Sequence, residues 1–125
     1  MNFLLDTYAL LWWLNDNPKI SAQAHVAISD PNSEIYVSAA SAWEISIKSA
    51  SGKLTMGNPL EDEIILNNFQ SLPITIAHAT SAGQLPVHHN DPFDRMLIAQ
   101  AMLENLTLVT RDEQIMRYDV ATLIT

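Results

Sequence analysis

Four short apolar runs divide the chain, and longer segments with helical spacing separate them. The runs are continuous rather than alternating, which is typical of strands buried on both faces of a parallel sheet. They occupy residues 2–5, 34–38, 72–76 and 106–110, and a fifth run at 120–124 is expected to add an edge strand. Strands that alternate with helices in this way predict an α/β domain of three layers around a central parallel sheet.

The segments between the runs carry the residues that favour helix ends. Ser21 is a predicted N-cap, and Pro59 opens a helix that has three acids in its first turn. Gly52 stands where the helix that begins at Ser41 is expected to end. Helices are expected at residues 7–15, 21–29, 41–52, 59–70 and 91–105, with a short last one at 112–118.

Length and composition limit the possible functions. The 125 residues, of which 48% are hydrophobic, suit a single packed domain that spans residues 1–125. No apolar run is long enough to cross a bilayer, and no basic residue precedes the apolar N-terminal stretch, so a cytoplasmic location is expected. The absence of cysteine excludes disulfides, thiolate zinc sites and cysteine nucleophiles. Carboxylates, histidines and hydroxyls are left to carry the chemistry.

The net charge of −8 disfavours nonspecific binding to nucleic acid, because a polyanion normally attracts a surplus of Lys and Arg. The exception is a protein whose carboxylates hold divalent cations. A bound cation reverses the local field and can then receive a phosphate. The positions of the acids along the chain therefore decide between these two cases.

Four acids fall near the edge of the sheet where a site is expected. Asp6 directly follows the first strand, and Asp112 comes shortly after the fourth. In an open parallel sheet, ligands bind beyond the carboxyl ends of the strands. Glu44 lies one turn into the helix that follows the second strand. Asp94 lies one turn into the helix that precedes the fourth strand, which leaves its position less determined.

Each of these acids also has a structural explanation. Asp91, followed by proline, is a predicted N-cap that places Asp94 in the first turn of its helix. Glu44 completes an S-x-x-E capping box with the serine three residues earlier. Asp6 and Asp112 can cap the helices that follow them, although serine or asparagine would cap equally well. The spacing of all four acids together favours a shared site.

The motifs around these acids resemble those of the PIN domain family. The similar stretches are "LLDTYALLWW", "SAASAWEISIK", "HHNDPFDRMLIAQA" and "LVTRDEQI", in the family's order and along its full length. The third is similar to a pattern in VapC-like toxins of bacterial toxin–antitoxin pairs. The resemblance implies the strand order 3-2-1-4-5, a metal-dependent ribonuclease that acts on RNA, a VapB-like antitoxin partner and a homodimer. It implies a metal site made of Asp6, Glu44, Asp94 and Asp112, with Thr7 and Thr110 beside it.

The chemistry of these side chains agrees with that implication. Carboxylates without cysteine suit Mg²⁺ or Mn²⁺ better than zinc, and we expect hydrolysis of a phosphodiester. Carboxylates crowded together are expected to repel one another and to raise their pKa values when no metal is bound. Arg95 and Arg111 follow acidic motifs and are candidate phosphate contacts, and Thr7 and Thr110 are further candidates for substrate binding. Arg95 can instead simply cover its neighbour.

Three alternatives remain beside this interpretation. His88, His89 and Asp91 lie close in sequence and offer a zinc or redox-metal site, but adjacent loop residues seldom point at one ion, so the pair is predicted to be ordinary loop. A phosphoacceptor receiver domain shares the α/β plan, yet it needs a late lysine and none follows Lys53. A catalytically silent PIN-like binding module stays open, because only a cleavage experiment separates it from an enzyme.

The first predicted helix suggests a contact with another chain. Residues 8–14 are apolar all round, so one face is expected to fill the core while the other needs a cover. Trp12 and Trp13 are the predicted contacts with a second copy or with the antitoxin.

Overall fold

The computed structural model describes residues 1–125 and contains one five-stranded sheet. Every pair of neighbouring strands is parallel, and the order across the sheet is β3-β2-β1-β4-β5. The strands are β1 (Asn2–Leu5), β2 (Glu34–Ser38), β3 (Gln70–Leu72), β4 (Thr107–Thr110) and β5 (Thr122–Ile124). The predicted α/β class and the strand order 3-2-1-4-5 are both confirmed.

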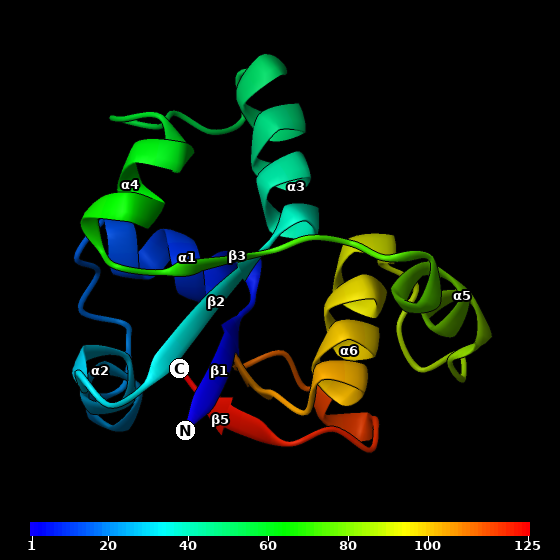
Figure 1. Ribbon diagram of the computed structural model, residues 1–125. Helices are drawn as coiled ribbons and strands as arrows, with labels where there is room; N and C mark the ends of the chain where they lie inside the picture. Colours follow the sequence, from blue (N-terminus) through cyan, green and yellow to red (C-terminus); the bar gives the residue numbers. More distant parts are fainter.

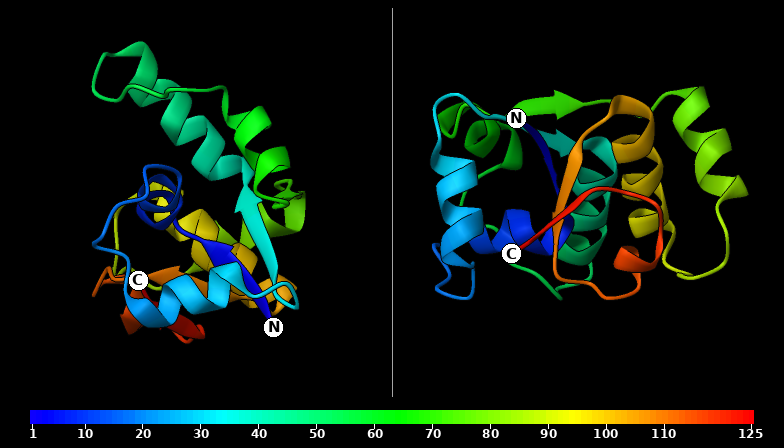
Figure 2. Two further views of the ribbon diagram at one scale, coloured as in Figure 1. Left: turned by 90° about the vertical axis from the view of Figure 1, so that its left-hand side faces the viewer. Right: turned by 90° about the horizontal axis from the view of Figure 1, so that it is seen from below.

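Helices cover both faces of this sheet. They are α1 (Thr7–Leu14), α2 (Ala22–Ser29), α3 (Ala39–Ala50), α4 (Leu60–Leu66), α5 (Ile76–Gln84) and α6 (Pro92–Glu104), with a 3-10 helix η1 (Ile115–Arg117). Figure 1 shows α1, α2 and α4 on one side and α5 and α6 on the other. The view from below in Figure 2 separates these layers. No helix combines the length and the apolar composition that crossing a membrane requires.

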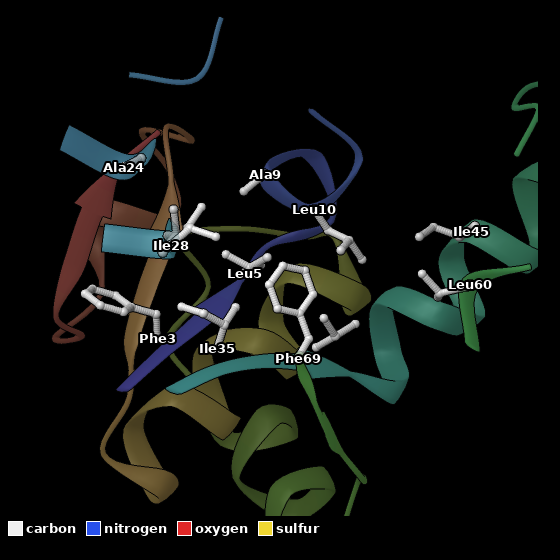
Figure 3. Packing of buried hydrophobic residues seen from close by; sticks show 12 residues of the cluster. Phe3, Leu5, Ala9, Leu10, Ala24, Ile28, Ile35, Ile45, Leu60 and Phe69 are labelled. Carbon is white, nitrogen blue, oxygen red and sulfur yellow. The ribbon is translucent and has the colours of Figure 1, made fainter. Parts of the chain in front are cut away.

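Two hydrophobic clusters, one on each face of the sheet, hold the layers together. Successive residues of each central strand point alternately to one cluster and to the other. Phe3 and Leu5 of β1 point to the cluster that α1 and α2 cover, which Figure 3 shows. Leu4 points to the other cluster, where it meets Leu97 and Ile98 of α6. Since strands buried on both faces need apolar residues at every position, the continuous runs in the sequence have a direct structural cause.

The third strand and the segment after it differ from the prediction. The strand was expected at 72–76 but ends at Leu72, and α5, which was not expected, begins at Ile76. Pro73 has no N–H to donate to a strand ladder. Thr75 then caps α5 through a capping box with His78. The apolar residues of this run therefore belong to two elements. Ile76, at the start of α5, is 86% exposed and does not contribute to the sheet.

Two helices also begin elsewhere than predicted. The N-cap of α3 is Ser38, whose Oγ accepts from the N–H of Ala40 at 2.9 Å, and not Ser41. Glu44 therefore lies in the second turn, and its predicted capping box is wrong. At the other end, Gly52 has a φ of 77°, as expected of the glycine that follows a helix. The last predicted helix shrinks to the single 3-10 turn of η1.

Candidate active site

Asp6 connects the end of β1 to the start of α1. Its backbone N–H donates to the Val109 carbonyl at 3.1 Å, which fixes the residue beside β4. Its Oδ1 accepts from the N–H of Ala9 at 2.7 Å and caps α1. The Thr110 hydroxyl donates to the same carboxyl group. Asp6 is thus a helix cap as well as a buried acid at the carboxyl edge of the sheet.

Thr110 joins Asp6 to Asp112. It is fully buried at the end of β4, and its Oγ1 accepts from the N–H of Asp112 at 3.1 Å. The carboxylate of Asp112 accepts through Oδ1 from the N–H of Gln114 at 2.8 Å. That bond leaves Oδ2 directed away from the chain's own turn. One threonine therefore sets the relative positions of two acids from different strands.

Asp94 reaches the same edge from the first turn of α6. Asp91 caps this helix, since its Oδ1 accepts from the N–H groups of Phe93 at 2.8 Å and of Asp94 at 3.0 Å. The predicted N-cap role of Asp91 is confirmed. With its backbone fixed in this way, Asp94 directs Oδ2 toward the other acids.

Glu44 brings the fourth carboxylate from α3. It is 7% exposed, and its Oε2 accepts from Lys48 Nζ at 2.8 Å across one turn of the helix. Its Oε1 is buried and has no hydrogen-bond partner. A buried carboxylate oxygen without a donor is costly, so this atom indicates a place for a ligand.

His89 occupies the space between two of the acids. Its Nε2 lies 2.9 Å from Oδ2 of Asp94 and 3.2 Å from Oδ2 of Asp112. Both histidines lie in the loop, as predicted. His88 is exposed and packs edge-on against Tyr118, whereas His89 is satisfied by the two acids. No sequence signal distinguishes the two, because the turn before α6 decides which imidazole faces inward.

The structure brings Asp94 and Asp112 within ligand distance of each other, together with His89. Asp6 and Glu44 lie near enough for their charges to act on this group. The pKa of Asp6 is raised to about 6, chiefly by burial and to a smaller extent by the charges of Asp112 and Glu44, while its hydrogen bonds lower it. Burial also raises the pKa of Asp94 to about 7, with a second contribution from the charge of Asp91. The expected rise is present, but desolvation contributes more than the repulsion between carboxylates on which the expectation rested.

Two buried threonines, Thr7 and Thr110, lie beside the acids of the site. Thr7 is 4% exposed, and its hydroxyl donates to Ser41 Oγ at 3.0 Å. Thr110 is fully buried against Asp6 and Asp112, as described above. Both positions lie beside the acids, as the resemblance implies. Their burial makes them supports for other side chains rather than surfaces for a substrate.

The two arginines differ in what they contact. Arg95 donates to backbone carbonyls of Ala82 and Leu85 at 2.9 and 3.0 Å, and further to Pro86 and His89. Its guanidinium therefore ties the loop before α6 in place, and the predicted phosphate contact finds no support there. Arg111 also donates to the chain itself, to the Thr125 hydroxyl at 3.1 Å and to the carbonyls of Lys19 and Thr125. It differs from Arg95 in that it borders a pocket of about 270 Å³ that Asp6 and Asp112 also line.

Comparison with known proteins places this arrangement in context. "Ribonuclease VapC22" of Mycobacterium tuberculosis (strain ATCC 25618 / H37Rv) is 27% identical over 115 residues, which cover 90% of this chain and 88% of that protein. A chain in the crystal structure of VapBC2 from Rickettsia felis, bound to a promoter DNA fragment, has a TM-score of 0.77 at 19% identity, with 100% and 99% of the two chains covered. A chain of a toxin–antitoxin complex from Klebsiella pneumoniae has a TM-score of 0.65 at 18% identity and covers 97% and 95%.

The solved structures share the fold at low sequence identity, and the four acids lie in the order that their motifs suggested. The family model of the PIN domain matches residues 3–121, nearly the whole chain. This protein belongs to the PIN domain family.

Proposed function

We propose that this protein is a metal-dependent endoribonuclease that acts as the toxin of a toxin–antitoxin pair. The observation that carries the proposal is the group of Asp94, Asp112 and His89 at one edge of the sheet, with Asp6 and Glu44 beside it. Burial raises the pKa of Asp6 to about 6 and that of Asp94 to about 7. Structural acids on a surface do not need such an arrangement. The similarity to a relative named ribonuclease supports the assignment of RNA as the substrate.

The residues at this edge fit a divalent cation. His89, Asp94 and Asp112 each offer one ligand atom, and these three atoms lie within 4.8 Å of one another. Glu44 adds a buried Oε1 that has no partner. The carboxylate oxygens suit Mg²⁺ or Mn²⁺, and no thiolate is present to favour zinc. The imidazole of His89 is the one donor in this group that is more typical of zinc. When bound, such an ion lowers the pKa of a water molecule and offsets the charge of the phosphate.

The chain's own residues hold this donor set in position. Thr110 and the N–H of Ala9 orient the Asp6 carboxylate, and Asp91 fixes the backbone of Asp94. Lys48 binds one oxygen of Glu44 and leaves the other to face inward. These supporting bonds keep the acids close together although burial and like charge oppose it, which is how a preorganised site is built.

The proposal includes a protein partner. Several solved structures that share this fold are complexes described as VapBC or as toxin–antitoxin. We therefore propose a VapB-like antitoxin as partner and a homodimer of this chain. The second candidate is a PIN-like binding module without catalysis, and the intact acid cluster favours the enzyme over it.

A cleavage assay tests the proposal. The purified chain is incubated with single-stranded RNA in Mg²⁺, in Mn²⁺ and in excess EDTA, and Asp94→Asn serves as the matched variant. We expect cleavage by the parent in either metal, none in EDTA and none by the variant. Cleavage that persists in EDTA contradicts the metal mechanism. RNA binding without cleavage in both metals favours the binding module.

A further inference from the structure

The pocket beside Asp6 and Asp112 has a wall that the acid cluster does not explain. Its volume is about 270 Å³, and its remaining lining comes from Tyr8, Trp12 and Arg111 together with Thr125. Two aromatic rings and a guanidinium thus stand directly next to the carboxylates. None of them is needed to hold the acids in place.

The position of the two rings follows from the cap at Asp6. Helix α1 begins immediately after this acid, so Tyr8 and Trp12, four residues apart, lie on the same face of the helix and one turn above each other. Their ring centroids are 6.4 Å apart. The core is filled by other residues of the helix, chiefly Ala9 and Leu10, and Tyr8 is 61% exposed.

Half of the chain's six basic residues lie against these two rings. Arg111 lies 4.5 Å from the centroid of the Trp12 ring and Lys19 lies 5.7 Å from it. Lys48 Nζ lies 5.6 Å from the centroid of the Tyr8 ring. Lys48 is paired with Glu44 at 2.8 Å, so Arg111 and Lys19 are the two cations at these rings that no carboxylate pairs. They lie within reach of phosphates that flank whatever group enters the pocket.

We propose that this pocket binds one unpaired nucleobase of the RNA, stacked on the aromatic wall next to the scissile phosphate. Aromatic side chains interleaved with cations are what single-stranded nucleic acid requires, because every base has a π face and every nucleotide a phosphate. The inference rests on the proposed ribonuclease function. It implies that the enzyme cuts loops or single strands, since a paired base cannot enter the pocket.

An apolar side chain of a protein partner is the competing occupant. Such a side chain needs apolar area but no π face, and the three cations give it no added attraction. A basic side chain meets both the cations and the carboxylates of Asp6 and Asp112 that line the same pocket. A nucleotide uses both the rings and the cations, so the composition of the wall favours RNA.

Fluorescence anisotropy of a labelled single-stranded RNA tests the inference in EDTA at low ionic strength, where no cleavage is expected. Tyr8→Leu and Trp12→Leu keep apolar area but remove the π face, whereas Tyr8→Phe and Trp12→Phe keep it. We expect the Leu variants to bind about tenfold more weakly and the Phe variants to stay within about twofold of the parent. Trp43→Leu, at a 63% exposed tryptophan outside the pocket, is the matched control and should bind like the parent.

A second measurement uses only the parent protein, so it decides the question even where a Leu variant does not fold. Abasic nucleotides are placed one at a time along the RNA, and one position should weaken binding by a similar factor. Leu variants that bind like the parent, or an abasic series without any sensitive position, overturn the inference and assign the pocket to a protein partner. If the sensitive position exists but RNA is not cut in Mg²⁺ or Mn²⁺, the stacking site stands and the ribonuclease proposal fails. If RNA is cut but no abasic position weakens binding, the ribonuclease proposal stands and the stacking site fails.

Discussion

At the scale of single residues, hydrogen bonding and burial act in opposite directions on Asp6 and Asp94. Each is held by hydrogen bonds that a structural acid needs, yet burial raises the pKa of Asp6 to about 6 and that of Asp94 to about 7. A group whose charged form is disfavoured in the folded state lowers stability when it ionises. Function and stability therefore give opposite signs to the same substitution at these two positions.

Asp6→Asn and Asp94→Asn test this conflict. Asparagine preserves the size of the side chain, and at position 6 it preserves the capping of α1. Activity should fall by more than about a hundredfold, because even outer-shell partners of a metal cost 10–100-fold. In EDTA both variants should melt at the parent's temperature or above it. A melting temperature well below the parent's would identify the acids as structural.

His89 adds a prediction about which ion binds. An imidazole donor is accepted by Mn²⁺ more readily than by Mg²⁺, which prefers oxygen. His89→Gln should weaken Mn²⁺ binding about tenfold and Mg²⁺ binding less, as measured by titration calorimetry and by the Mn²⁺ EPR signal. The exposed His88→Gln is the control and should change neither. Equal losses for both ions would remove His89 from the ligand set.

At the scale of elements, the start of α6 separates two neighbouring aspartates. Asp91 accepts two backbone N–H bonds, whereas Asp94 faces the other acids. Asp91→Ala should cost about 0.5–2 kcal/mol of stability, as the loss of an N-cap does, while cleavage per folded molecule survives. Asp91→Ser, which restores a cap, should recover most of that stability. Denaturant unfolding measures both, and lost cleavage with unchanged stability would reverse the two roles.

Helix α1 likewise has two faces with different tasks. Trp13 is partly buried, packs against the hydrophobic cluster and donates from Nε1 to Asn67 Oδ1 at 3.0 Å, so the fold already uses part of its ring. Its contact with another chain stays a prediction. Trp12 lines the pocket beside the acids instead. Trp13→Glu should destabilise the fold by about 2–3 kcal/mol, since it removes the partly buried ring and its bond to Asn67. The exposed Trp43→Glu should melt close to the parent, and a stable Trp13→Glu protein would return this residue to an interface.

At the scale of the whole molecule, the buried acids couple folding to pH and to metal. Both pKa values lie above 3.8, so between about pH 4 and 7 the folded state binds more protons than the unfolded state, and stability falls as pH rises through that window. In EDTA the melting temperature should therefore be higher at pH 5 than at pH 8. Saturating Mn²⁺ should reverse this order, because the ion replaces the protons and binds best when the acids are ionised. The same pH order in both buffers would contradict metal binding at these acids.

Several features of this protein are determined by local sequence alone. Continuous apolar runs are what a sheet buried on both faces requires, so the α/β fold class and the central strands follow from the sequence. Ser21, Asp91 and Gly52 act where capping chemistry places them, because such bonds form within one turn. Strand ends likewise placed Asp6 and Asp112 at one edge of the sheet, whereas Asp94 was assigned to it through the resemblance of its motif.

Tertiary structure decided what depends on distant parts of the chain. The boundary between β3 and α5 is not among these features, because Pro73 and the capping box of Thr75 and His78 are local signals that the prediction of a strand at 72–76 overlooked. Only the packed turn before α6 selects His89 over His88 for the gap between Asp94 and Asp112. The guanidinium of Arg95 is occupied by carbonyls of a loop that sequence spacing does not locate. Local patterns fix which bonds a residue can make, and the fold fixes which partners are near enough to make them.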